Sequence, residues 1–193
     1  MTDVSPVPRG RLAAVALLVL VIQTTVISQV PPFAGAADIV PLAAMSIGLL
    51  YGSLTGAFFG FGIGLGLDLL LVQPLGQYAL LNLAVGYSAG RLAELRPPSG
   101  ALFLIPLGAC AVALTTIGFG ILQVMFGGGA SLSGAVVRQT AIAVLWGGLL
   151  AVPVNAAVAR LATPGGGRGT ARRSRRRAYA TGGLSPLTPG RKR

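Results

Sequence analysis

The chain has 193 residues, of which 53% are hydrophobic and only 10% are charged, yet its formal net charge is +11. A soluble domain carries about 25% charged residues, so the composition excludes an ordinary water-exposed globule. Ten of the fifteen basic residues and none of the four acids lie from Arg160 onward. The basic character therefore belongs to the tail, and the body is a nearly neutral apolar block typical of a membrane protein.

Six apolar segments follow one another along the body and are separated by turn signals. A helix needs about 20 mostly apolar residues to cross the hydrocarbon core, so run length and helix breakers define the predictions. The predicted helices cover about residues 12–30, 39–50, 54–72, 77–92, 101–126 and 135–159. The second segment is short, and is therefore tilted, partly re-entrant or extended into the turn at 51–53. The sequence predicts an all-α integral membrane protein, a six-transmembrane-helix bundle over residues 12–160.

The first apolar segment also has features of a secretory signal peptide. Arg9 and Arg11 precede it, and Ala34-Gly35-Ala36 resembles a cleavage site. The apolar core of a signal peptide runs about 7–15 residues, whereas this one is longer and further spans follow. We therefore predict an uncleaved first helix.

The orientation follows from the basic residues of the short loops, which favour the cytoplasmic side. Residues 1–11, the loop at 91–100 and the tail at 161–193 contain nearly all of them, and the connections after the first, third and fifth helices contain none. Six crossings place all three basic segments on one side. The sequence predicts a multi-pass membrane protein with both termini in the cytoplasm.

The tail, residues 161–193, is rich in Gly, Ser, Pro and Arg. It has too few apolar residues to offset the entropy of ordering, so we predict that it is disordered. A basic run can bind nucleic acid. Membrane segments lie directly upstream, however, and this position favours an anchor on anionic lipids, where each Arg contributes about 1 kcal/mol. The arginines assigned to the membrane surface are Arg172, Arg173, Arg175, Arg176 and Arg177.

The residue types needed for most catalysis and metal binding are absent from the sequence. There is no histidine, which a serine triad and a Cys/His metal site require, and Cys110 is the single cysteine. Cys110 lies in an apolar run and is predicted to be a small buried residue. The segment ending at Asp68 superficially resembles the motif of intramembrane aspartyl proteases, but an extra residue separates glycine from aspartate and no second carboxylate is assigned to it. We predict no enzyme, no cofactor and no metal.

Glycines recur at four-residue spacing along the middle of the chain. In lipid, small residues at this spacing let helix backbones approach closely. They either pack helices of this chain together or dock a transmembrane helix of another protein. The glycines assigned to this role are Gly52, Gly56, Gly60, Gly64, Gly86 and Gly90.

Two ionisable residues lie inside predicted spans. Charged groups are costly in lipid, so ionisable residues inside a span are candidates for a functional role. Asp68 lies about one turn before the outer end of the third helix, and Arg138 about one turn inside the outer end of the sixth. We expect them to approach each other as an ion pair or through polar intermediaries, or else to snorkel separately to the outer interface. Asp38, before the second helix, is predicted to be an N-cap.

The middle of the chain resembles the rod shape-determining protein MreD family. The resemblance covers about residues 20–92, and only hydropathy matches beyond them. Its motifs are Asp38-Ile39-Val40-Pro41, the run of glycines that ends at Asp68, Pro74-Leu75-Gly76 and Gly86-Tyr87-Ser88-Ala89-Gly90. The family often has Pro directly before the first aspartate, where this chain has Ala37, and the Arg-rich tail is not a family hallmark.

The resemblance implies a non-enzymatic integral membrane scaffold of the cell-elongation machinery. Such a protein would bind the bitopic protein MreC and, indirectly, MreB and the RodA/penicillin-binding-protein synthase. It also implies a fold similar to the substrate-binding subunits of energy-coupling-factor transporters. The alternative function is therefore a small-molecule carrier subunit, whose pocket would be lined by Gln23, Thr24, Asp68, Asn82 and Arg138.

Overall fold

The computed structural model describes residues 9–27, 38–71, 74–95, 100–126 and 134–162. All of them belong to the first of the two units into which the chain divides, residues 1–162, and the second unit is residues 163–193. The predicted disorder of the tail and the lipid contacts of Arg172 to Arg177 lie outside the described residues. Pro31-Pro32 and Gly127-Gly128-Gly129, which separate predicted helices in the sequence, also lie outside the described residues.

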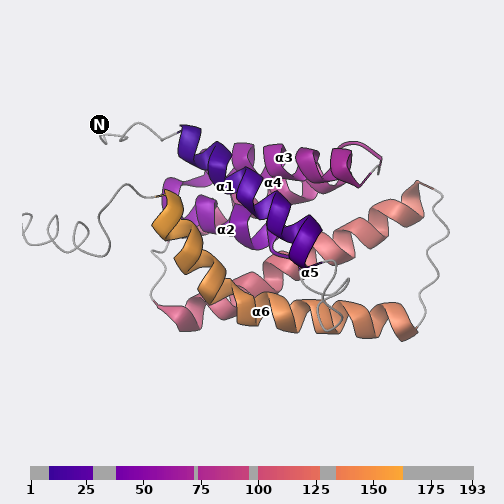
Figure 1. Ribbon diagram of the computed structural model, residues 1–193. Helices are drawn as coiled ribbons and strands as arrows, with labels where there is room; N and C mark the ends of the chain where they lie inside the picture. The colour runs from indigo at the N-terminus through magenta and orange to yellow at the C-terminus, as the bar shows by residue number, and fades with distance from the viewer. Residues whose placement is uncertain (1–8, 28–37, 72–73, 96–99, 127–133, 163–193) are drawn as a thin grey trace, which may run out of the picture. The chain divides into compact units, whose positions relative to one another are not determined.

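The described residues form six α-helices, as predicted, and one short π-helix (Figure 1). The predicted boundaries lie within three residues of the observed ones wherever the structure describes them. The elements are α1 (Arg9–Ile22), the π-helix η1 (Gln23–Ile27), α2 (Val40–Tyr51), α3 (Ser53–Leu70), α4 (Gln77–Leu95), α5 (Ala101–Met125) and α6 (Gly134–Ala162).

Helix α2 is the centre of the bundle. Its residues from Val40 to Gly48 are all buried, and it contacts α1, α3, α4, α5 and α6. At 12 residues it is about 18 Å long, which is shorter than the roughly 30 Å of the hydrocarbon core. Because the other helices enclose it, α2 does not have to match the bilayer thickness, which explains how an apolar segment this short is accommodated.

Three helices are long and apolar enough to cross a membrane by length and composition. They are α3 and the segments Leu102–Met125 of α5 and Val136–Ala162 of α6. Helix α4 is of similar length but more polar, and it lies against α2 and α3. The described part of the chain is therefore all-helical, and its apolar helices are those of a membrane protein.

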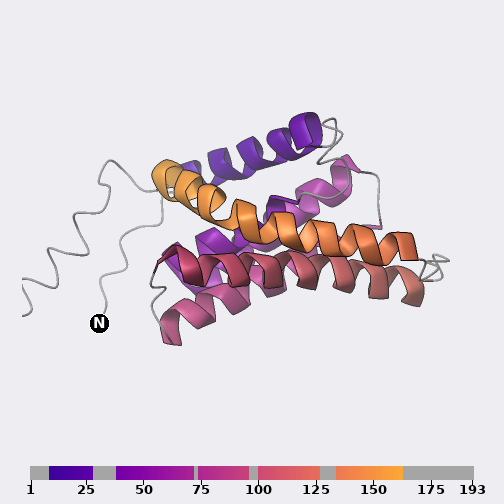
Figure 2. The same cartoon turned by 90° about the horizontal axis from the view of Figure 1, so that it is seen from below.

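Helices α5 and α6 cross where small residues allow it. A Cβ added at Gly108 would meet Ala151, and one added at Gly147 would lie 2.5 Å from a methyl group of Val112. From this crossing the two helices diverge toward the Met125 end of α5 and the Gly134 end of α6 (Figure 1). The turned view shows the axes of both helices lying lengthwise along the bundle (Figure 2), and the chain runs through them in opposite directions.

The bundle has two chemically different ends. The aspartate end holds Asp38 and Asp68, together with the first turns of α2 and α4. Tyr78 of α4 contacts both aspartates there, since its N–H donates to Asp68 and its hydroxyl donates to Asp38. The arginine end holds Arg11, Arg91 and Arg160. There the Tyr51 hydroxyl at the end of α2 donates to the Ala162 carbonyl at the end of α6, over 2.8 Å. The helices alternate in direction between these two ends.

Candidate functional site

The predicted glycine row forms the contact between α3 and α4. A Cβ added at Gly60 would lie 2.7 Å from the Asn82 carbonyl carbon, and one at Gly64 would lie 2.6 Å from the Ala79 Cα. A Cβ at Gly56 or Gly86 would likewise meet the backbone of the other helix. Only glycine permits this approach, because in each case the obstacle is backbone and cannot move aside.

This packing changes the interpretation of the glycines as a docking surface. Gly56, Gly60, Gly64, Gly86 and Gly90 are buried inside the bundle. Gly48 of α2 also packs on α4, since a Cβ there would lie 3.1 Å from the Gly90 nitrogen. Gly52 turns the chain between α2 and α3 with a φ of 92°. The buried glycines therefore pack helices of this chain together, which is one of the two roles predicted for them, and docking of a partner helix stays a prediction.

Asp68 caps the beginning of α4. Its Oδ2 accepts hydrogen bonds from the backbone N–H groups of Gly76 (2.9 Å) and Ala79 (3.3 Å), and its Oδ1 accepts one from Tyr78 (3.2 Å). The first N–H groups of a helix have no partner within the helix, and their partial positive charge favours a carboxylate. Asp68 is only 1% exposed, so these bonds are what allows a charged group to be buried here.

The predicted direct pairing of Asp68 with Arg138 is not found. Within the described part of the chain, the recorded ion pair joins Arg91 to Glu94 over 3.2 Å. Asp68 is buried and its oxygens face the start of α4, whereas Arg138 is exposed on α6. The physical reason is that backbone N–H groups eight to eleven residues away satisfy the carboxylate locally. The possibility of contact through polar intermediaries stays a prediction.

A second polar cluster connects η1, the start of α2 and α4 at the aspartate end. The Gln23 side chain accepts a hydrogen bond from the Ile39 N–H over 3.0 Å, and Asp38 accepts bonds from the Val40 N–H and the Tyr78 hydroxyl. Ile39 occupies the cap position predicted for Asp38, which lies one residue earlier and still accepts the first N–H of the helix. Asp38 precedes the helical segment, and burial raises its pKa to about 6.

The arginine end has its own carboxylate cap, which the sequence analysis missed. Glu94 accepts bonds from the N–H (3.0 Å) and hydroxyl (2.8 Å) of Ser53, the first residue of α3, and pairs with Arg91. The available signal was Ser53 directly after a turn glycine. The partner lies 41 residues away, so local sequence could not identify it. The sequence analysis also missed Tyr78, because its partners are likewise distant in the sequence. Its ring contacts Phe119 of α5, with 5.1 Å between the ring centroids.

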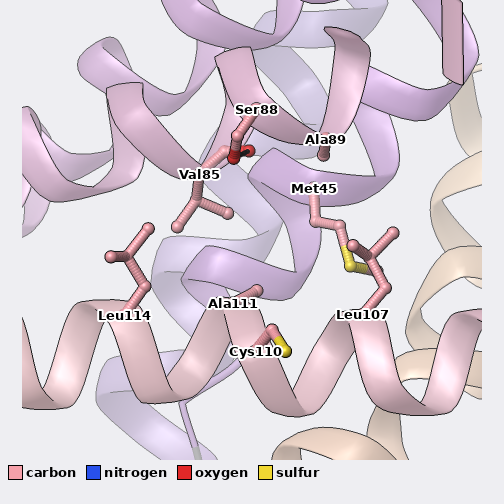
Figure 3. Close-up of a pocket in the computed structure, with 8 residues that line it drawn as sticks. All are labelled: Met45, Val85, Ser88, Ala89, Leu107, Cys110, Ala111 and Leu114. Carbon is pink, nitrogen blue, oxygen red and sulfur yellow. Dashed lines mark hydrogen bonds between the residues drawn. The ribbon is translucent and has the colours of Figure 1, made fainter. Parts of the chain in front are cut away.

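The cavities bear on the carrier hypothesis, which requires an enclosed pocket of about 300–1,000 Å³ with converging polar groups. One cavity, of about 90 Å³, lies between α2, α4 and α5 and is lined mostly by apolar side chains, Ser88 being an exception (Figure 3). A groove of about 460 Å³ between α1 and α3 is open and, apart from Thr55, apolar. None of the five polar residues assigned to a carrier pocket lines either space, so the carrier function is not supported.

Figure 3 also shows Cys110 on α5 at the edge of the small cavity. The cysteine is exposed, so the prediction that it is buried is wrong. Its helix turns this side chain toward the outside of the bundle, where an apolar environment suits a thiol equally well. Among the described residues, no cluster of metal-ligating side chains is found.

These features define an α-helical membrane protein whose glycines and carboxylates are largely engaged in holding its own helices together. The family model described as rod shape-determining protein MreD matches residues 9–161. The chain belongs to this family, and it is a rod-shape-determining membrane protein. Comparisons with curated proteins and with solved structures give no match.

Proposed function

We propose that this protein is a non-enzymatic scaffold of the bacterial cell-elongation complex, which binds an MreC-like bitopic membrane protein and thereby regulates lateral peptidoglycan synthesis. The observation that carries the proposal is the match to the rod-shape family over residues 9–161. MreB and the elongation synthase join indirectly through the bitopic partner. The protein lies in the inner membrane with six spans and both termini in the cytoplasm, and the Arg-rich tail contacts anionic lipids.

The construction of the bundle supports a scaffold. Its conspicuous polar side chains, Asp38, Asp68 and Glu94, accept hydrogen bonds from backbone or side-chain groups of the chain itself. They fix helix ends in place, as a rigid platform requires. The open groove between α1 and α3 and the small cavity beside Met45 lack the converging polar groups of a substrate site.

Depletion of the protein in a rod-shaped host tests the function. We expect cells to become round, because lateral wall synthesis loses its scaffold, while septal division continues. Co-purification from solubilised membranes tests the partner, and the tagged chain should retain the MreC-like protein. Unchanged cell shape together with loss of uptake of one nutrient would overturn the proposal in favour of a carrier.

A further inference from the structure

Arg138 is an exposed cation for which the described bundle offers no partner. It lies in the second turn of α6, near the aspartate end, and has neither a hydrogen bond nor an ion pair among the described residues. Between Arg138 and Arg160 the helix has no charged residue. These 22 residues span about 33 Å, close to the hydrocarbon thickness, so the two arginines lie at opposite membrane boundaries.

The acidic side chains of the chain do not supply a partner. Asp38 and Asp68 are engaged in the caps at the aspartate end, and Glu94 pairs with Arg91 at the arginine end. Asp3 is the fourth and last acidic residue, six residues before the start of α1. Six extended residues reach at most about 22 Å. Arg138 lies about 36 Å along α6 from Ala162, which packs with the first half of α1 at the arginine end.

A second copy of the chain would not provide a carboxylate for Arg138, because its own carboxylates are engaged in the same way and it adds another Arg138. Apolar side chains alone would not select a partner helix either, since lipid tails are as apolar as leucine. A partner with a carboxylate at the membrane boundary therefore fits this surface better than a copy of the chain or an uncharged helix does.

The face of α6 around Arg138 is shaped for close approach. Gly134, Arg138, Ala141 and Leu145 follow each other at spacings of four, three and four residues, so they share one side of the helix, and all four are exposed. A Cβ added at Gly134 would meet nothing within 4 Å. The two small residues, one on each side of Arg138, let a second backbone come near the guanidinium. Here α6 has diverged from α5, as Figure 1 shows.

We propose that this Arg138 face, residues Gly134, Arg138, Ala141 and Leu145, binds a transmembrane helix of a different protein, and that Arg138 pairs with a carboxylate of that protein at the membrane boundary. The proposal rests on the scaffold function proposed above and assigns its helix-docking surface. It replaces the glycines of α3 and α4, which are covered inside the bundle.

The test measures how much MreC-like partner co-purifies with the tagged full-length chain from membranes. Arg138→Gln removes the charge and Ala141→Leu adds bulk on the same face. Each should lower the retained partner by about tenfold or more, as expected when one member of a desolvated charge pair or a close contact is lost. Arg138→Lys should retain most binding. Ala157→Leu is the matched control, because Ala157 is also exposed on α6 but lies about 160° around the helix from Ala141.

A second arm identifies the carboxylate and separates it from lipid phosphate. Each acidic residue of the partner at its outer membrane boundary is changed to the amide, alone and with Arg138→Gln. We expect one such change to weaken binding as Arg138→Gln does, with no further loss in the double variant. Strictly additive losses would mean that Arg138 contacts lipid phosphate and would overturn the pairing.

Binding undiminished in both Arg138→Gln and Ala141→Leu would overturn the docking surface while leaving the scaffold function intact. Failure of the unmodified chain to retain any partner would instead overturn the scaffold function itself. Gel filtration of every variant checks that the bundle is folded, which is expected because both altered side chains are exposed.

Discussion

Asp68 illustrates how a buried charge is stabilised inside this bundle. Three backbone N–H groups at the start of α4 point at its two oxygens, so the carboxylate connects the end of α3 to the beginning of α4. Because Asp68 is only 1% exposed, these charge-assisted bonds lie in an apolar, low-dielectric environment, where each of them contributes more than it would at the surface.

Replacing Asp68 with asparagine should destabilise the protein by about 1–2 kcal/mol, the usual cost of losing a helix cap. The asparagine amide keeps one acceptor oxygen, but its NH2 group would face backbone N–H groups of α4 that need an acceptor. The measurement is the free energy of unfolding in detergent. Glu94→Gln is the matched control, since it removes the charge from a carboxylate that also caps a helix but is exposed. Equal effects of the two changes would contradict the role of burial.

Asp38 should make stability depend on pH. Burial raises its pKa from 3.8 to about 6 in the folded protein, so between these values the folded state holds a proton that the unfolded state has lost. Stability should therefore fall as pH rises from 4 to 7, and this loss should be absent in Asp38→Asn. Thermal midpoints of both proteins across that range give the comparison. A constant difference between them would show that Asp38 titrates alike in both states.

At the scale of the elements, the contact between α3 and α4 is made by backbone against backbone. Gly60 and Gly62 lie on the same helix, two residues apart, but on different sides. A Cβ at Gly60 would meet the Asn82 peptide, whereas one at Gly62 would meet nothing within 4 Å. Both glycines have the same low helix propensity, but only Gly60 packs against another backbone. Comparing substitutions at the two positions therefore distinguishes the effect of packing from the effect of helix propensity.

Gly60→Ala should destabilise the protein by about 1–3 kcal/mol, because the methyl group forces two backbones apart. Gly62→Ala should be neutral or stabilising by up to about 1 kcal/mol, because alanine is the better helix former. The thermal midpoints of the two purified variants measure the difference. If both variants shift alike, the close approach of α3 and α4 at Gly60 is not what holds them together.

The sequence predicted the helices well and their contacts poorly. Apolar runs and breakers located all six helices, since length and hydropathy are local properties. The burial of Gly60 against Asn82 and the capping of α3 by Glu94 depend on which helices become neighbours, and no local pattern encodes that. For Arg138, equal depth suggested a partner in Asp68, but depth does not say which way each side chain faces around its helix.

At the scale of the whole molecule, the distribution of arginine gives the bundle a direction. Arg11, Arg91 and Arg160 share one end, where the Tyr51 hydroxyl bonds the last residue of α6, and Arg138 lies toward the other. Val15 of α1 and Ala162 of α6 belong to one core cluster, so the chain enters and leaves the bundle at the same end. The two ends of the described chain lie on the same side of the bundle whether or not α2 crosses the membrane completely.

We therefore expect the arginine end to face the cytoplasm. Alkaline phosphatase, which is active only outside the cytoplasm, should be active when inserted at 127–133, between α5 and α6. It should be inactive at 96–99 or after residue 193, where a fluorescent protein should fluoresce instead. An active phosphatase at the C-terminus would reverse the orientation. It would also move the Arg138 face to the cytoplasmic boundary, so the partner carboxylate that pairs with Arg138 would then lie at the inner boundary of the partner helix, and the fusion therefore decides which acidic residues of the partner are to be changed.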